Sequence, residues 1–231
     1  MKDFGYIEEN LRRVSAAIAN AAHAANRPLP RMVAVTKSAS PEEVVALVDL
    51  GVSEIAENRT VLFRERWALF SDEKRPVMHL IGSLQTNKVK EVVGDAALIQ
   101  SVDRRSLALE IQKRAQKAGI RQGVLLEINS GREEAKGGAL PEEAEALAEE
   151  IALLPNVSLE GVMTMGPVGV ETEVLRQAFR ETREIYERLS QRGLLGDCPI
   201  LSMGMSESFP LAIEEGATMV RIGRTLFAHE Q

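Results

Sequence analysis

The sequence has few of the residues that mark several large classes of protein. It contains one cysteine, Cys198, so no disulfide can form within the chain, and a reducing, cytoplasmic location is the simplest expectation. No apolar run approaches the roughly 18 residues that a membrane span needs. The N-terminal stretch is charged and amphipathic, and it lacks the apolar segment of a signal peptide. We therefore predict a cytoplasmic protein with no membrane partner.

Features of nucleic-acid and metal sites are also scarce. Aromatic residues make up 4% of the chain and the net charge is −6, whereas a nucleic-acid-binding protein usually has basic excess and stacking side chains. The three histidines, His23, His79 and His229, lack metal-ligand spacing, and one cysteine cannot build a zinc site. No phosphate-binding loop of the Walker type and no GxGxxG motif occurs. We expect no nucleic-acid partner and no metal.

What the chain does have is a regular alternation of apolar runs and amphipathic stretches. Its 231 residues are 45% hydrophobic and contain no low-complexity linker, which favours a single domain over residues 1–231. Several runs are apolar almost throughout, as in parallel strands that are buried on both faces. The eight expected strands are Met32–Thr36, Glu54–Glu57, Val77–Ile81, Ala97–Val102, Val124–Ile128, Leu159–Met165, Ile200–Met203 and Met219–Ile222.

Helical periodicity separates these runs, which predicts a parallel sheet. Capping residues support several helices: Ser40 precedes Pro41, Asp103 could cap the helix that follows it, and Gly119 and Gly193 stand where helices should end. Eight strands favour a closed (β/α)₈ TIM-type barrel with an extra N-terminal helix. The run 54–57 is the weakest strand because it contains two acids, and without it the sheet would be open or irregular. Helices are expected over 5–25, 41–50, 59–70, 86–93, 104–118, 141–153, 171–192 and 207–215.

The active site of such a barrel forms at the C-terminal ends of its strands. Lys37 follows the first strand, where it could simply mark the strand end and point to water. A lysine that is desolvated at the barrel mouth is instead a nucleophile that forms Schiff bases. That chemistry needs a carbonyl partner, and pyridoxal 5'-phosphate (PLP) is the commonest cofactor that supplies one.

A phosphate site is expected in the loops after the last two strands, which in barrels often bind phosphate. These loops read Ser202-Met203-Gly204-Met205-Ser206 and Gly223-Arg224-Thr225. Small residues let backbone N–H groups approach phosphate oxygens, and Ser206 precedes a helix expected to begin at Glu207. Ordinary turns with an N-capping serine would leave the same pattern.

Two polar residues fall inside expected strands. Arg221 must be paired or functional there, because an unpaired buried charge is costly, and an internal salt bridge to Glu127 is one explanation. For His79 a packed or hydrogen-bonded role is favoured over one as a base or ligand. Lys136, before a glycine pair, could also reach the barrel mouth.

The chain resembles the pyridoxal-phosphate homeostasis proteins, which share the barrel of the alanine racemase N-terminal domain. The resemblance runs over nearly the whole length. It includes "IEENLRRV", "MVAVTK" with Lys37, "AEN" at 56–58, "HLIGSLQTNKVK" at 79–90, "SVD" at 101–103, "EIN" at 127–129, "AKGG" at 135–138, "LEGVMTM" at 159–165 and "LSMGMSESFPLAIEEGATMVRIG" at 201–223.

The resemblance implies that PLP forms an internal Schiff base, an aldimine, with Lys37. Ser206 and Gly223 would bind the phosphate, with Arg224 where the family usually has a small residue. Arg221 would face the pyridine nitrogen, and Asn58 and His79 would form the pocket wall. We also expect Ser202 and Met203 to bind the cofactor. The family is linked to PLP, vitamin B6 and amino-acid homeostasis, without established catalysis.

We expect a monomer, because one closed barrel needs no partner, and apo PLP-dependent enzymes are candidate partners beyond PLP. The chain departs from the family pattern at Ala39, at Ala56 and over 60–62, which puts secondary contacts in doubt. An alanine-racemase-like activity is the main alternative, but racemases need a second base, commonly a tyrosine, and Tyr6 and Tyr186 both fall on expected helices. A phosphate-binding barrel without PLP would leave Lys37 unexplained.

Overall fold

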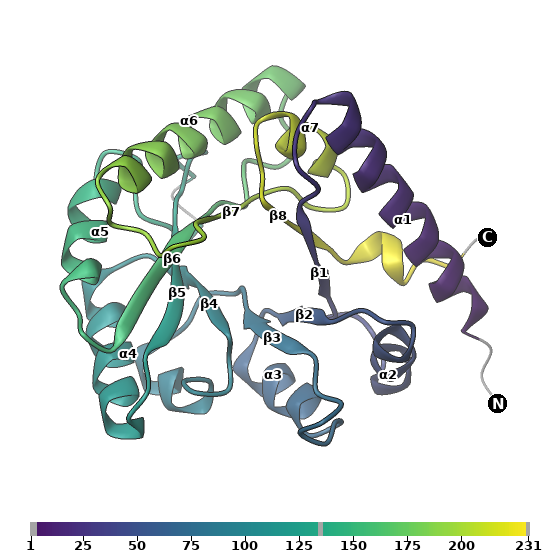
Figure 1. Cartoon of the computed structure of the whole chain (residues 1–231), viewed down its shortest axis with the longest axis horizontal. Coiled ribbons are helices and arrows are strands. Elements are labelled where there is room, and N and C mark those ends of the chain that lie inside the picture. Colours follow the sequence, from purple (N-terminus) through teal and green to yellow (C-terminus); the bar gives the residue numbers. More distant parts are fainter. Residues whose placement is uncertain (1–3, 134–135, 230–231) are drawn as a thin grey trace.

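The chain folds into a closed barrel of eight parallel strands, in a computed structural model that describes residues 4–133 and 136–229. The strands are hydrogen-bonded in chain order and β8 closes the ring against β1, so the predicted barrel is confirmed (Figure 1). The strands are β1 (Arg31–Val35), β2 (Glu54–Glu57), β3 (Val77–Leu80), β4 (Leu98–Val102), β5 (Gln122–Glu127), β6 (Val157–Met163), β7 (Ile200–Ser202) and β8 (Met219–Ile222).

Helices cover the outside of the ring (Figure 1). The extra N-terminal helix α1 packs against α7, α2 and the short turn η2 after β8, so it covers the seam between the first and last strands. The helices are α1 (Gly5–Ala24), α2 (Pro41–Asp49), α3 (Thr60–Trp67), α4 (Arg105–Ala118), α5 (Ala144–Ala152), α6 (Thr172–Gln191) and α7 (Phe209–Glu214), and the 3₁₀ turns are η1 (Thr86–Glu91) and η2 (Arg224–Leu226).

The capping predictions have mixed outcomes. Ser40 accepts a hydrogen bond from the Glu43 N–H while the Glu43 side chain accepts one from the Ser40 N–H, a complete capping box. Gly119 ends α4 in the left-handed conformation, with φ 68°, and Gly193 follows α6 with φ 66°. The prediction that Asp103 caps α4 is wrong, because Arg104 occupies the cap position and no side chain caps that helix.

The expected helix start at Glu207 is also wrong. Helix α7 begins at Phe209, with Pro210 in its first turn and Ser208 at the cap position. Ser206 therefore lies in the loop after β7 and does not cap a helix. A proline fixes its own φ near −65° and lacks an N–H, so it starts a helix readily but cannot continue one. The sequence pattern missed this later start because the acid at 207 resembled a first-turn residue.

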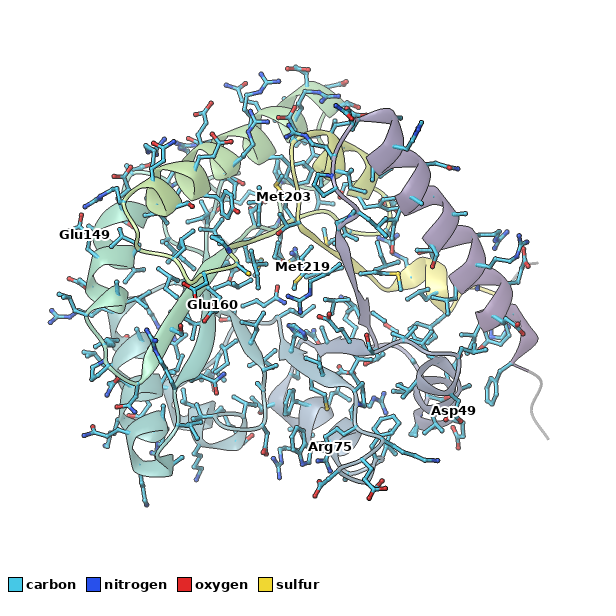
Figure 2. The ribbon with its side chains drawn as sticks, viewed as in Figure 1. Asp49, Arg75, Glu149, Glu160, Met203 and Met219 are labelled. Carbon is cyan, nitrogen blue, oxygen red and sulfur yellow. The ribbon has the colours of Figure 1, made fainter. Side chains whose placement is uncertain are left out.

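Two apolar layers result from side-chain alternation along the strands. The larger layer lies between the strands and the helices. The smaller one fills the inside of the barrel, where Met219 is seen near the centre of the ring (Figure 2). The interior layer consists of Val33, Val35, Ala56, Leu98, Leu125, Met163, Ile200 and Met219.

The strand that the sequence predicted least clearly, β2, is present despite its two acids. Glu54 is paired with Arg31, whose Nη2 lies 2.6 Å from Glu54 Oε2. Glu57 is fully buried and is paired with Arg66 on α3. Paired acids can occupy strand positions because their charges are compensated. Within the described part of the chain, no helix is both long and apolar enough to cross a bilayer.

Candidate functional site at the barrel mouth

Lys37 lies in the turn directly after β1. Val33 and Val35 point into the barrel, and Lys37 follows Val35 by two residues, just beyond the end of the strand. Its side chain is exposed, so the expected desolvated amine is not found. Among residues 4–133 and 136–229, no hydrogen bond or ion pair engages that amine. The register places the neighbouring strand ends beside it, because Val35 pairs with Ala56 and Ala34 with Ile222.

A buried ion pair holds this turn. Glu57 Oε1 accepts a hydrogen bond of 2.5 Å from Thr36 Oγ1, just before Lys37. Arg66 Nε lies 3.4 Å from the same oxygen, and Arg66 Nη2 donates to the Ala39 carbonyl at 2.6 Å. Burial raises the pKa of Glu57, and the contacts with Thr36 and Arg66 offset part of that rise. The sequence analysis missed Arg66, although an acid inside an apolar strand indicates that a buried cation is near.

Asn58 lies at the mouth, one residue beyond β2. Its Oδ1 atom is buried and has no hydrogen-bond partner within the described protein, and a buried polar atom of that kind is costly. Gly82 packs directly on this residue: a Cβ at Gly82 would lie 2.0 Å from the Asn58 carbonyl oxygen. The loop after β3 can therefore close over Asn58 only because position 82 has no side chain.

The loops after β7 and β8 meet, as the sequence predicted. Ser206 Oγ accepts a hydrogen bond of 3.3 Å from the Gly223 N–H and lies 3.4 Å from Thr225 Oγ1. Two hydroxyls and a backbone N–H thus gather at one point of the barrel rim. Such a group of donors suits a phosphate. Thr225 is a member that the sequence analysis did not single out.

Two residues from these loops point elsewhere. Arg224 is exposed and pairs with Glu207, with 2.8 Å between Nη1 and Oε1. The Met203 side chain packs in the outer apolar layer, and its N–H donates to the Met219 carbonyl. Met203 therefore supports the loop through packing (Figure 2).

Arg221 projects into the barrel from β8 and is 2% exposed. Nη1 donates to Ser202 Oγ at 2.6 Å, and Nη2 donates to the Thr164 carbonyl at 2.8 Å. Burial lowers the pKa of Arg221 to about 10, while the nearby charge of Glu127 opposes that shift. Within the described residues no ion pair joins Arg221 to Glu127, so the salt bridge that was the alternative explanation for Arg221 is not formed.

Glu127 ends β5 and faces the same interior. Burial raises its pKa to about 7, the charge of Asp103 adds to the rise, and Arg221 acts in the opposite direction. A carboxyl group with this pKa is partly protonated near neutral pH and can exchange protons with a ligand. Asp103 also accepts a hydrogen bond of 3.3 Å from the Gly138 N–H, which ties the loop before α5 to the mouth. The Lys136 amine, which the sequence placed near the mouth, pairs with Glu133 in that loop.

His79 is fully buried inside the barrel and is hydrogen-bonded, so the packed or hydrogen-bonded role that the sequence favoured is confirmed. Gln100 Nε2 lies 3.1 Å from its Nδ1 atom. On the other side, His79 Nε2 lies 3.1 Å from Glu54 Oε2, a contact that would be an ion pair only with a doubly protonated ring and that lacks the alignment of a hydrogen bond. No cluster of three potential metal ligands occurs in the ranges that the structure describes.

The arrangement therefore has an accessible amine and a donor cluster for an anion at the rim, and a buried arginine and a carboxyl group of raised pKa inside the barrel. It suits a small molecule with both a carbonyl and a phosphate group. The alanine racemase N-terminal domain family matches residues 5–231.

Two relatives of this chain have the same name. A pyridoxal phosphate homeostasis protein from Aquifex aeolicus is 43% identical over 225 residues, which are 96% of this chain and 98% of that protein. One from Helicobacter pylori is 34% identical over 200 residues, 85% of this chain and 86% of that protein.

Solved structures show the same barrel. PipY of Synechococcus elongatus, with PLP bound, is similar at 27% identity and a TM-score of 0.84, and the match covers 96% of this chain and 100% of that chain. Alanine racemase from Clostridium difficile shares the fold alone, at 18% identity and a TM-score of 0.78 over 98% of this chain and 60% of that chain.

Proposed function

Because this chain belongs to the family of pyridoxal phosphate homeostasis proteins, we propose that it binds PLP at the barrel mouth and serves in PLP, vitamin B6 and amino-acid homeostasis. The observation that carries the proposal is the joint position, at one rim, of a lysine amine without a protein partner and of the donor cluster at Ser206 and Gly223. These two groups match the aldehyde and the phosphate of one small molecule. PipY, with its bound PLP, supports the same reading.

The residues present fit this cofactor. Lys37 supplies an amine, and PLP supplies an aldehyde that condenses reversibly with amines and releases water. Ser206, Gly223 and Thr225 offer hydrogen-bond donors to a phosphate. Ser202 would not contact the cofactor itself but accepts a hydrogen bond from Arg221. The buried Oδ1 atom of Asn58 is available to a ligand donor.

In this proposal Arg221 would meet the ring. It lies in β8, two residues before Gly223, which directly follows that strand, and it is deeper in the barrel. If Gly223 approaches the phosphate, Arg221 lies towards the pyridine nitrogen. Arginine can only donate hydrogen bonds, so it would leave that nitrogen unprotonated. This weakens the electron-withdrawing capacity of the ring and suits the protein to holding the cofactor rather than to catalysis.

The racemase alternative needs a second base at the mouth, and neither tyrosine lies there. Tyr6 on α1 donates a hydrogen bond to Glu43, and Tyr186 on α6 donates one to the Pro199 carbonyl on the outside of the barrel. We therefore propose a carrier without catalytic turnover, which acts as a monomer and passes PLP to apo PLP-dependent enzymes. Size-exclusion chromatography with light scattering would test the monomer.

The decisive experiment compares Lys37→Ala with Lys117→Ala, an exposed lysine in the last turn of α4, where the chain approaches the N-terminal end of β5, opposite the mouth. After incubation with PLP and reduction with borohydride, the wild-type protein and Lys117→Ala should retain covalent pyridoxyl on one peptide, which contains residue 37. Lys37→Ala should lose both the label and the yellow colour while its circular dichroism spectrum is unchanged. A label that persists on another lysine of that variant would show that Lys37 is not the attachment site.

A further inference from the structure

A line of polar side chains crosses the inside of the barrel, below the mouth. It begins at Arg221 on β8, whose Nη1 donates to Ser202 Oγ on β7 at 2.6 Å. The Ser202 hydroxyl in turn donates to Gln100 Oε1 on β4 at 2.8 Å. Ser202 and Gln100 are fully buried, and Arg221 is 2% exposed. The proposed function assigns no role to Gln100.

The line continues to the opposite wall. Gln100 Nε2 lies 3.1 Å from His79 Nδ1, and an amide nitrogen can only donate. Nδ1 must therefore accept, which leaves the ring proton on Nε2, 3.1 Å from Glu54 Oε2. Glu54 is also bound by Arg31. Burial acts to raise the pKa of Glu54, but the contacts with His79 and Arg31 outweigh it and lower the pKa to about 2, so the carboxylate stays charged.

Every hydrogen bond in the line runs in the same direction, from the residue nearer Arg221 to the residue nearer Glu54. Arg221 donates to Ser202, Ser202 to Gln100 and Gln100 to His79, whose remaining N–H faces the carboxylate of Glu54. A cation thus lies at one end and an anion at the other. Hydrogen bonds in such chains polarise one another, and a polar group in an apolar interior is costly unless each of its atoms is paired. The line therefore has few alternative arrangements.

We propose that Ser202, Gln100 and His79 are positioning residues that hold the Arg221 guanidinium in the orientation in which it meets the ring nitrogen of bound PLP. This inference rests on the proposed function. Two of the five guanidinium N–H groups bond to Ser202 and Thr164, which fixes the plane of the group and leaves donors for a ligand. Without Gln100, Ser202 would lose the acceptor that sets its hydroxyl direction.

The test uses two probes, PLP and its 1-deaza analogue, in which a C–H replaces the ring nitrogen. Their dissociation constants are measured for the wild-type protein, Gln100→Leu, Ser202→Ala and Arg221→Gln. Met163→Leu is the matched control, because Met163 is fully buried in the same interior and its side chain has no hydrogen bond within the described residues. Melting curves show that each variant is folded. Ser202→Ala removes one hydroxyl only and serves if Gln100→Leu does not fold.

We expect the wild-type protein and Met163→Leu to prefer PLP over the analogue by roughly 10- to 100-fold, which corresponds to one hydrogen bond to a charged donor. In Gln100→Leu and Ser202→Ala the ratio should fall towards one, as it should in Arg221→Gln. If Gln100 and Ser202 had a purely structural role, their replacement would lower the affinity for both ligands equally and leave the ratio of the two dissociation constants unchanged.

The outcomes separate this inference from the proposed function. If Arg221→Gln loses the preference but Gln100→Leu and Ser202→Ala keep it, the positioning role is wrong and PLP binding stands. If Arg221→Gln also keeps the preference, Arg221 does not meet the ring nitrogen and the inference is wrong. If the wild-type protein binds neither probe, the proposed function itself is wrong.

Discussion

The hydroxyl of Ser206 accepts a hydrogen bond of 3.3 Å from the backbone N–H of Gly223, which ties the loop after β7 to the end of β8. A phosphate bound at this point would offer a charged oxygen as acceptor in place of the Ser206 hydroxyl oxygen. Ser206→Ala should weaken PLP binding by about 1–3 kcal/mol, since a charge-assisted hydrogen bond is lost.

The matched ligand for that experiment is pyridoxal, which has the aldehyde but no phosphate. Its affinity should change much less in Ser206→Ala. Titration of both ligands into wild-type protein and variant, followed by absorbance, measures the difference. Equal losses for the two ligands would place the phosphate elsewhere.

The ion pair under the Lys37 turn is expected to control stability. Arg66→Met leaves Glu57 buried without its cation and frees the Ala39 carbonyl, so the free energy of unfolding should fall by about 3–5 kcal/mol. Borohydride trapping of PLP should also decline, because the turn that carries Lys37 loses its support. Urea unfolding and trapping measure the two effects.

The double variant Glu57→Gln with Arg66→Met is the control for that prediction. It removes the buried charge together with its partner, so most of the lost stability should return. If it is as unstable as Arg66→Met alone, packing of the arginine, and not charge compensation, accounts for the loss.

The contact between Gly82 and Asn58 gives a third prediction. Gly82→Ala would place a methyl group 2.0 Å from the Asn58 carbonyl oxygen, so the backbone must shift. We expect a loss of about 3 kcal/mol or more in unfolding free energy, as for severe overpacking. Gly119→Ala has open space but a positive φ, and should cost about 1 kcal/mol. Similar losses for both would mean that the loop after β3 adapts.

Glu127 should make the apo protein less stable as the pH rises. Its pKa of about 7 in the folded state exceeds the unfolded value of about 4.3, so the folded state binds the proton more tightly between these values. Stability is then lost as the pH rises from about 4.3 to about 7 and stays lower above that.

Glu127→Gln removes this dependence. At pH 8 it should raise the unfolding free energy of the apo protein by about 1–3 kcal/mol, with little change near pH 4.5. Glu65→Gln, at an exposed position on α3, is the control and should be neutral at both values. Urea titrations across this range measure the effect, and a parallel shift at all pH values would exclude Glu127 as the titrating group.

Much of the fold follows from local patterns that the sequence displays directly. The strands are short apolar runs, and Ser40 and Gly119 cap helices through contacts within a few residues. The boundaries near Asp103 and Ser206 were mispredicted because proline placement and tertiary contacts outweighed weak capping preferences there. The position of the candidate site residues at strand ends was predictable because parallel strands bring their carboxyl ends to one rim.

The sequence by itself determined that a lysine, an arginine and small-residue loops would stand at the ends of strands in a closed barrel. Only the tertiary structure decided which polar atoms meet: that Arg66 pairs with Glu57 beneath Lys37, that Arg221 binds Ser202 and not Glu127, and that Gln100 links Ser202 to His79. Side-chain alternation determines on which face of the sheet each strand residue lies, but it does not determine which other side chain that residue contacts. The partner depends on the register and curvature of strands that are far apart in the chain, such as β4 and β7, whose residues Gln100 and Ser202 meet only when the barrel closes.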